Sequence, residues 1–411
     1  MRSIQDQLQA VLAAARPVTP LDVVLADAAG CVLAEDLLAP VSVPARPLAA
    51  YDGYALDSGA VSQVTPGRPV VLPVAHDVGA DAAEPLRLAP AHAVRVASGA
   101  PLPLGADVVV PVGWTDRGTA RVEVHRSIAP GEGVRPAGAD AREGEVVIPA
   151  GLRLGAPQIG IASALGLRRL RVHPRPRVVV LPVGDELLEA GSPPRAGRVH
   201  DANGPMLATA AQAVGASAHR AVIAPDERTA LREAIEDQLV RADLLVITGG
   251  LGDGPDDTVR DVLAPLGTVR FDHVAMSPGQ RLGFGTVERE GSGEAVPIFA
   301  LPGHPVSAMV AFEVFVRPAL RAIAGYTELF RTTVSATAAA EWAVPSGLRQ
   351  FVPATLSGSP AEGYRVLPLG DPVRTDLGSL ARANAFAVVG ERATSVSVGD
   401  AVHALVLDSR G

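Results

Sequence analysis

The sequence predicts a multidomain α/β protein organised around an open, mostly parallel sheet with helices on both faces. Strands and helices alternate from residue 177 to residue 323, which is typical of such a three-layer domain. The segments 61–149 and 332–411 instead contain short apolar runs separated by Gly and Pro, so we expect β-rich domains there and no helix of note. At 411 residues the chain is long enough for several domains of about 100–200 residues each.

The composition argues against several classes of partner. Net charge is −8 and aromatic residues make up 3% of the chain, so we expect no nucleic-acid partner, which would need basic patches or stacking platforms. No apolar stretch approaches the roughly 18 residues of a membrane span, and we find no signal peptide. We therefore expect a cytoplasmic protein without a membrane partner. All 36 basic residues are arginine, and the single Cys31 excludes an internal disulfide.

The N-terminal region opens with a predicted helix over residues 4–14. Ser3 is a suitable N-cap, and Pro17 ends the pattern. Short apolar runs around Gly30 indicate strands between residues 21 and 40. The D-G-Y segment that follows is compatible with an ordinary turn, or with a loop that presents Asp52 to a ligand.

The next hundred residues predict a small all-β domain. Its strands are expected at residues 70–74, 93–97, 108–112 and 121–124. A hydroxyl and a tight turn follow the second of these, at Ser98 to Pro101, and a glycine-rich loop ends in the isolated carboxylate of Asp140. Each is a weak signal alone. A short helix over 157–167 and the Pro174-Arg175-Pro176 segment then mark a domain boundary.

The α/β region contains the strongest functional signal. Its expected elements, in order, are a strand at 178–183, a helix at 201–214, a strand at 221–224, a helix at 226–240 capped by Asp226, strands at 244–247 and 296–301, and a helix at 306–323. Ligands of such sheets bind beyond the carboxyl ends of the strands. Glu186, the Asp256-Asp257 pair and the turn 302–307 all follow strand ends, so we expect them to meet at one edge.

The segment 243–260 predicts an anion site. A buried strand leads into a turn with four glycines, Pro255 and two aspartates, and a helix is expected to start at Pro255. Free backbone N–H groups at such a junction bind oxyanions, and adjacent carboxylates hold Mg²⁺. Alternatively, the aspartates only favour the helix dipole, and His304 is only a capping or packing residue. A Walker motif is excluded because it needs a lysine, and neither G-x-S-x-G nor H-E-x-x-H occurs.

Taken together, the motifs resemble one family. The ordered set is D-G-Y-A from Asp52, S-G-A-P from Ser98, G-V-R with Asp140, G-D-E-L from Gly184, Gly249-Gly250, Pro278-Gly279 and L-P-G-x-P-V-S from Leu301. This set resembles the molybdopterin molybdenumtransferases, which are related to the C-terminal domain of gephyrin, and it covers nearly the whole chain.

The resemblance implies an elongated homodimer whose active site lies between the α/β domain of one subunit and the inserted β-rich domain of the other. It implies a linking domain at 1–48 and 149–175, an inserted domain at 49–148, an α/β domain at 176–328 and a C-terminal, barrel-like β domain at 329–411. The implied reaction takes molybdate and adenylylated molybdopterin, with Mg²⁺, and yields molybdenum cofactor and AMP. The adenylyltransferase that makes the substrate is a possible partner.

The resemblance also assigns roles to residues. Asp52, Asp140, Glu186, Asp257 and Arg281 are expected to be catalytic, and Asp256 and Asp257 to hold Mg²⁺. Substrate-binding positions are expected at Ser98, Gly99, Ala100, Pro101, Asp201, Asn203, Gly249, Gly250, Gly254, Pro278, Gly279, Pro302, Gly303, His304, Pro305, Ser307 and Ser379.

One departure from the family pattern bears on activity. The loop that usually carries lysines has Ser277 and Gln280 at those positions, and Arg281 is adjacent. Two hypotheses follow: an active transferase in which Arg281 and His304 replace lysine, or a paralogue that keeps the fold and acts as a binding or scaffold module. A third, an adenylyltransferase, fits the α/β domain alone and leaves the flanking β domains unexplained.

Overall fold

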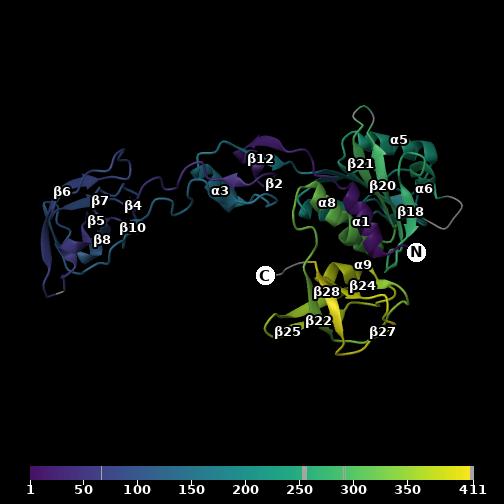
Figure 1. The fold of residues 1–411 in the computed structure, drawn as a ribbon. Coiled ribbons are helices and arrows are strands. Elements are labelled where there is room, and N and C mark those ends of the chain that lie inside the picture. Colours follow the sequence, from purple (N-terminus) through teal and green to yellow (C-terminus); the bar gives the residue numbers. More distant parts are fainter. Residues whose placement is uncertain (66, 252–256, 290, 292, 408–411) are drawn as a thin grey trace.

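The computed structural model describes all residues except 66, 252–256, 290, 292 and 408–411. The molecule is elongated, with a β-rich lobe at one end, a small lobe in the middle, and an α/β domain packed beside a β-barrel at the other end (Figure 1). The multidomain α/β fold class is therefore confirmed. Among the described residues no helix is long and apolar enough to span a bilayer.

The β-rich lobe, here called the inserted lobe, contains a five-stranded sheet. Its order is β8 (Val108–Pro111), β5 (Gly53–Leu56), β7 (Ala93–Val96), β6 (Val70–Val78) and β9 (Arg121–Val124). The strands β6, β7, β8 and β9 agree with the predicted segments, except that β6 is longer. The strand β5 was not predicted, because its first residues belong to the D-G-Y segment that was interpreted as a turn or a loop. Two short 3₁₀ turns, Ser58–Val61 and Val112–Trp114, accompany the sheet. The paired strands β4 (Leu48–Ala49) and β10 (Val134–Arg135) lie where the chain enters and leaves the lobe.

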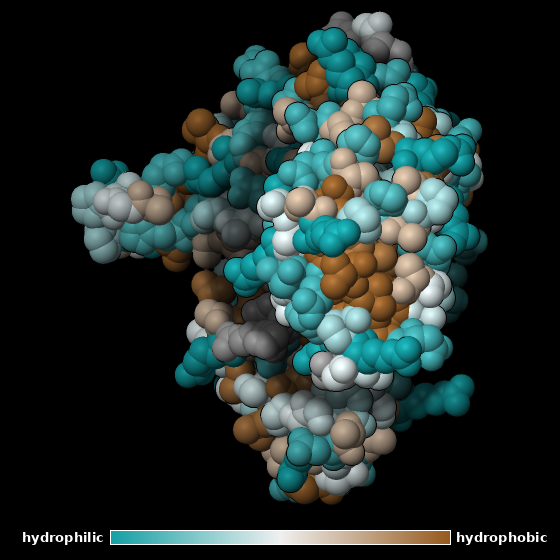
Figure 2. Space-filling model, turned by 90° about the vertical axis from the view of Figure 1, so that its left-hand side faces the viewer, coloured by the Kyte–Doolittle hydropathy of each residue, from teal (hydrophilic) through white to brown (hydrophobic). Residues whose placement is uncertain are grey.

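The face of the molecule at the end that carries the inserted lobe is mainly polar. Seen from the end that carries the inserted lobe, hydrophilic residues dominate and surround one compact apolar patch (Figure 2). This distribution agrees with the 19% of charged residues in the sequence.

The linking lobe is assembled from two distant chain segments. The first supplies β1 (Leu21–Val24), α2 (Leu25–Ala28), β2 (Val32–Leu33) and β3 (Leu37–Leu38); the second supplies β11 (Val146–Ile148), α3 (Ala156–Ala164) and β12 (Arg169–His173). The strand β12 lies between β1 and β2, and β11 pairs with β3. The chain therefore passes outward through this lobe, forms the inserted lobe, and returns. Gly166, with φ of 76°, follows α3 as predicted.

The α/β domain has a six-stranded sheet. Its order is β16 (Ser217–Arg220), β13 (Arg177–Pro182), β17 (Leu244–Thr248), β21 (Ala295–Leu301), β20 (Arg281–Glu288) and β18 (Arg270–His273). The first four strands are parallel to one another, β20 is antiparallel to β21, and β18 is antiparallel to β20. A mostly parallel sheet is confirmed, and the strands β20 and β18 were not predicted.

Helices cover both faces of this sheet because alternate strand residues point to opposite sides. Leu244 and Val246 pack in one core with α1 (Ile4–Ala14), α4 (Asn203–Ala213), α7 (Pro305–Ala311) and α8 (Arg317–Ile323). Leu245 and Ile247 pack in a second core with α5 (Arg228–Leu239) and α6 (Thr258–Leu263). Ser3 caps α1 by accepting the N–H of Asp6, as predicted.

Two expectations for this domain are wrong. The strand predicted at 221–224 is β16, four residues earlier; Val222 is 79% exposed, and only Ala224 bridges to a neighbouring strand. The cap predicted at Asp226 is instead Glu227, whose carboxylate accepts the N–H groups of Thr229 and Ala230. Asp226 is drawn away from the cap position because its own N–H donates to Asp185.

The C-terminal region closes into a five-stranded barrel. Its strands are β24 (Arg349–Ser359), β25 (Gly363–Pro368), β22 (Thr333–Ala338), β28 (Ala401–Val406) and β26 (Ala385–Val389), and pairing of β24 with β26 closes it. The expectation of no helix here is wrong, because Asp376 caps the short helix α9 (Leu377–Arg382). A strand of the α/β domain, β19 (Met276–Ser277), pairs in parallel with β24 and joins the two domains.

The N-terminus is tied to the same region. The N–H of Arg2 donates to the carbonyl of His273, and the N–H of Ala275 donates to the carbonyl of Arg2. Arg2 therefore forms a strand-like bridge beside Val274, two residues before β19. The first residues of the chain consequently support the loop that connects to the barrel.

A buried ion pair fixes the barrel to the helices. The predicted helix 306–323 is α7, a π-helical turn (Phe312–Val316) and α8. Glu313, in the π turn, accepts from Arg331 Nε at 2.6 Å and from its Nη2 at 2.9 Å. Arg331 Nη1 donates to the carbonyl of Leu407. Burial lowers the pKa of the neighbouring Arg317 to about 10, which is the expected effect of removing a cation from water.

We predict that Glu313→Gln lowers the free energy of unfolding by about 3 kcal/mol or more, because the amide leaves the Arg331 guanidinium without its anion. Urea unfolding followed by the fluorescence of Trp342, which lies in the barrel core, measures this loss. The control is Glu236→Gln, which breaks the exposed pair with Arg232 and should cost at most about 1 kcal/mol. Equal losses in the two variants would contradict a special role for Glu313.

Candidate functional site

Apart from Ser379, the predicted site residues fall into two groups at opposite ends of the molecule. One group lies at the carboxyl edge of the α/β sheet, and the other lies in the inserted lobe (Figure 1). We describe each group separately, because a single copy of the chain does not bring them together.

The first group surrounds a cavity of about 320 Å³, here called the α/β cavity. It is lined by Leu251, Ser277, Pro278, Gly279, Gln280, Arg281, Pro302, Gly303 and Ser307. Six of the predicted substrate-binding or catalytic residues therefore line one cavity, and they come from the segment between β19 and the start of β20 and from the turn after β21. The expectation that Glu186 and the Asp256-Asp257 pair meet this turn stays a prediction, because neither Glu186 nor Asp257 lines the cavity and Asp256 lies outside the described residues.

Two glycines make the close packing of this edge possible. Gly249 and Gly250 have φ angles of 95° and 65°, which side chains rarely adopt. A Cβ on Gly249 would overlap the carbonyl oxygen of Val183, and one on Gly250 would overlap the side chain of Val259. A Cβ on Gly303 would lie 3.7 Å from the Gly249 Cα. The backbone segments that follow β13, β17 and β21 therefore lie close together.

Asn203 and Asp201 hold this arrangement from behind. Asn203 Nδ2 donates to the carbonyl of Gly303 at 2.8 Å, and its Oδ1 is buried without a partner among the described residues. Asp201 accepts the N–H of Gly204 at 2.9 Å and pairs with Arg220 Nε at 2.6 Å. Through its bond to Gly204, Asp201 supports the start of α4. Asp201 is almost fully buried and does not line the α/β cavity.

The two carboxylates of this group differ in environment. Glu186 is exposed just after β13. Asp257 caps α6 by accepting the N–H of Arg260 at 3.1 Å, and burial raises the pKa of its carboxyl group against the lowering effect of Arg260. The predicted helix start at Pro255, the metal ligand Asp256 and the cradle residue Gly254 lie outside the described residues.

The basic residue of the α/β cavity is Arg281, at the start of β20. Its Nη1 approaches the carbonyl of Leu251 at 3.4 Å. His304 is exposed and occupies the N-cap position of α7 without a side-chain capping bond among the described residues, and Pro305 is the first residue of that helix. The capping alternative for His304 therefore applies to its backbone position only.

Ser379 lies elsewhere, in the barrel. Its hydroxyl donates to Asp376 Oδ2 at 2.7 Å, and its N–H donates to Asp376 Oδ1 at 2.8 Å. The residue is fully buried in the cap of α9. The structure accounts for Ser379 as a capping residue.

The inserted lobe contains a cavity of about 440 Å³, here called the lobe cavity, and Asp52 is the member of the second group that lines it. The cavity is lined by Asp52, Gly53, Tyr54, Asp77, Val78, Gly79, Arg95, Val96, Ala97, Val112 and Arg117. Asp52 Oδ1 accepts the N–H of Ser98 at 2.7 Å, and the Ser98 hydroxyl donates to the carbonyl of Ala50. The ligand-presenting reading of Asp52 and Ser98 is thus compatible with the structure.

Other predicted residues of this lobe have local roles. Gly99 has φ of 82°, and Ala100 and Pro101 are buried in the turn beside Ala49. Asp140 forms an ion pair with Arg135 and does not line the lobe cavity. Sequence reasoning missed Arg95 and Arg117. A usable signal was the D-R-G turn at residues 116–118, directly before a predicted strand of the same sheet.

A metal centre is not preformed in the described part of the chain. There, no three His, Cys, Asp or Glu side chains gather closely enough to hold an ion. Of the two predicted metal ligands, only Asp257 is among the described residues. It directly follows residues 252–256, which the structure does not describe.

Comparisons with known proteins cover the whole chain. Family models match three consecutive regions: the MoeA N-terminal region (domains I and II) at residues 2–166, a probable molybdopterin binding domain at 179–322, and the MoeA C-terminal region (domain IV) at 335–407.

Sequence relatives and solved structures agree with these matches. The chain is 38% identical to molybdopterin molybdenumtransferase 1 of Mycobacterium tuberculosis over 100% of both proteins. It is 37% identical to molybdopterin molybdenumtransferase 2 of the same organism over 97% of this chain and 98% of that protein. A solved structure of the molybdopterin biosynthesis protein MoeA from Pyrococcus horikosii has a TM-score of 0.80 at 27% identity, covering 99% of each chain.

We predict that Gly249→Ala destabilises the protein well beyond the ~1 kcal/mol expected for a left-handed backbone alone, because the methyl group also overlaps Val183. The control is Gly166→Ala, at φ of 76° with no heavy atom within 4 Å of the added Cβ. Thermal unfolding of both variants separates the conformational cost from the steric one. A Gly249→Ala protein as stable as the control would mean that the edge can relax.

Proposed function

Because the chain belongs to the molybdopterin molybdenumtransferase family, we propose that it transfers molybdenum from molybdate to adenylylated molybdopterin and releases AMP. The observation that carries the proposal is the α/β cavity, where Gly279 and Gly303 lie beside Arg281 at the carboxyl edge of the sheet. Backbone N–H groups and a guanidinium are suited to phosphates and oxyanions.

The residues present fit a Mg²⁺ ion. The pKa of Asp257 is raised chiefly by burial, so its carboxylate gains by pairing with a cation. Mg²⁺ is commonly held by one or two carboxylates, with waters and substrate phosphates completing its shell; hence a preformed cluster of ligands is not required. When bound, the ion would neutralise charge on the pyrophosphate. We assign Asp257 to this role, and Asp256 as its neighbour in sequence.

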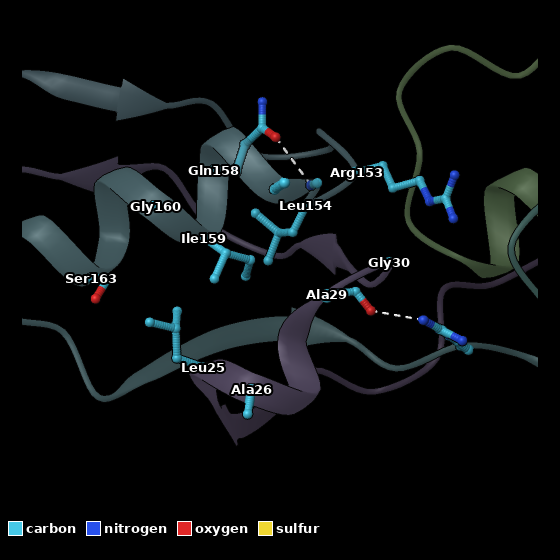
Figure 3. Close-up of a pocket in the computed structure, with 13 residues that line it drawn as sticks. Leu25, Ala26, Ala29, Gly30, Arg153, Leu154, Gln158, Ile159, Gly160 and Ser163 are labelled. Atoms are coloured by element: carbon cyan, nitrogen blue, oxygen red, sulfur yellow. Dashed lines mark hydrogen bonds between the residues drawn. The ribbon is translucent and has the colours of Figure 1, made fainter.

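We further propose a homodimer with a shared site. In one chain, the inserted lobe lies at the far end from the α/β domain (Figure 1). Asp52, which lines the lobe cavity, and the α/β cavity can therefore contact one substrate only if they come from two copies. The linking lobe offers a contact surface. A wide pocket of about 1110 Å³ there is lined largely by small and apolar side chains, with Leu25, Leu154 and Ile159 around it (Figure 3).

The scaffold hypothesis has one observation in its favour. Ser277 and Gln280 line the α/β cavity at positions where the family pattern has lysines, and the chain contains no lysine. The alternative is therefore a paralogue that binds the pterin nucleotide without inserting molybdenum. Cytoplasmic location and contact with the adenylyltransferase remain predictions that accompany either reading.

The decisive assay incubates the purified protein with adenylylated molybdopterin, Mg²⁺ and molybdate and follows AMP. We expect release of AMP that requires molybdate. If no AMP is released at millimolar molybdate, the transferase activity is excluded and the scaffold hypothesis is favoured.

Arg281→Ala should raise the molybdate concentration needed for half-maximal turnover by roughly tenfold or more, since a charge-assisted hydrogen bond is worth about 1.5–3 kcal/mol. Arg270→Ala, on the outer strand β18, is the control. An unchanged molybdate dependence would remove Arg281 from the site.

Mixed dimers test the shared site. Asp52→Asn and Arg281→Ala should each reduce turnover strongly as homodimers. If one site uses Asp52 of one copy and Arg281 of the other, a mixed dimer of the two variants contains one intact site and one doubly altered site. Co-expression with two different tags and purification of the mixed species should therefore recover up to about half of the wild-type rate per dimer. No recovery would place both residues in the same subunit's site.

A further inference from the structure

The lobe cavity contains an arginine whose conformation and surroundings single it out. We propose that Arg117 is a substrate-binding residue that contacts an oxyanion of the reaction, either molybdate or the phosphates of the pterin nucleotide. The proposal rests on the proposed function and names a residue of the same site that neither the motifs nor the family resemblance indicated.

The first observation is where Arg117 lies. The cavity forms where the start of β5 meets the ends of β7, β6 and β8, which are neighbouring strands of the sheet. Asp52 and Arg117 both line it, although they are 65 residues apart in the sequence. Its volume of about 440 Å³ is in the range of small-molecule sites, which is about 300–1,000 Å³. Arg117 is thus part of the wall that carries Asp52.

The second observation concerns charge. The other arginine of the cavity, Arg95, is neutralised by Asp77, with 2.6 Å between Nη2 and Oδ2. In the part of the chain that the structure describes, no carboxylate pairs with Arg117, and its backbone N–H donates to Thr115 Oγ1 at 3.2 Å. Asp52 is engaged by the N–H of Ser98. Arg117 is therefore the cation of this cavity that is available to an incoming anion.

The third observation is backbone strain that the neighbouring residues maintain. Arg117 has φ of 62°, a left-handed conformation that is costly for a residue with a side chain. Asp116 Oδ1 accepts the N–H groups of Gly118 and Glu123, which lowers the pKa of its carboxyl group. The Tyr54 hydroxyl donates to the carbonyl of Gly118. These bonds hold the turn on both sides of Arg117.

The charge of the substrates explains why the α/β cavity needs another cation. Molybdate carries two negative charges, and the nucleotide adds a pyrophosphate. Arg281 is the only basic side chain among the nine residues of the α/β cavity. A guanidinium offers a planar fork of donors that matches tetrahedral oxyanions. In the shared site, Arg117 would come from the second copy. It would supply a positive charge that the neutral side chains of Ser277 and Gln280 cannot supply.

The test compares Arg117→Gln, Arg117→Lys and Arg117→Gly with Arg121→Gln, an exposed arginine of the same hairpin outside the cavity. With full-length protein, the apparent KM for molybdate and for the pterin nucleotide is measured in turn, the other substrate being saturating. We expect Arg117→Gln to raise one of the two by roughly tenfold or more, Arg117→Lys to recover part of it, and the control to match wild type. The substrate whose KM rises identifies the oxyanion. Unchanged KM values for both would overturn the proposal.

Arg117→Gly separates binding from folding. Glycine accepts φ of 62° without strain, so its melting temperature should equal or exceed that of wild type while its KM rises as in Arg117→Gln. A rise in KM accompanied by a lower melting temperature in all three variants would indicate a structural role and overturn the assignment.

A binding readout keeps the proposal testable even if the wild type releases no AMP. Trp114 belongs to the same hairpin and is partly exposed, whereas the other tryptophan, Trp342, is buried in the barrel. Titration with sodium molybdate and, separately, with inorganic pyrophosphate should give a saturable fluorescence change in wild type that Arg117→Gln loses and Arg121→Gln retains. A wild-type response that Arg117→Gln fully retains, or no response in wild type to either probe, would overturn it.

Discussion

Direct contact between backbone segments is the constraint on which the α/β cavity depends. The strand ends at Val183 and Gly249 approach so closely that no side chain fits between them, and Gly303 lies next to Gly249. As a result, the backbone that follows these strands is held in place by the sheet. Asn203 secures the outermost of these segments through the carbonyl of Gly303. Rigid main-chain donors lose little entropy on binding a phosphate, which is the advantage of a site built this way.

The same cavity is coupled mechanically to the barrel. The loop that contains Ser277 contributes both to the cavity wall and, through β19, to the edge of β24. The ion pair between Glu313 and Arg331 attaches the helical layer to the start and end of the barrel. Two independent attachments therefore make the α/β domain and the barrel one packed unit, while the inserted lobe extends away on the linking lobe.

Much of this architecture could be predicted from the sequence. The alternation of buried strands and amphipathic helices indicated the parallel sheet, and turn residues after β13, β17 and β21 indicated where its functional edge lies. The antiparallel strands β20 and β18 were missed because glycines such as Gly283 and Gly285 interrupt the apolar pattern of β20. The run at 221–224 was mistaken for a strand because it is short and apolar, whereas in the fold Val222 is exposed and Ala224 alone forms an isolated bridge, to Val183.

The candidate site was predictable to the extent that local chemistry revealed it. Glycines, prolines and carboxylates at strand ends could be recognised. The D-R-G turn marked Arg117 as well, but the strand pairing that brings this residue to the same cavity as Asp52 could not be derived from the sequence. Asp201 shows the opposite case. A carboxylate near a strand end looks functional in the sequence, yet burial against Arg220 gives it a structural role.

The bridge between Arg2 and Val274 has a practical consequence for handling the protein. The amino-terminal backbone is part of the scaffold next to β19, so an affinity tag placed directly before Arg2 would crowd the loop that forms one wall of the α/β cavity. Kinetic comparisons among variants are then meaningful only when the position and removal of the tag are the same throughout.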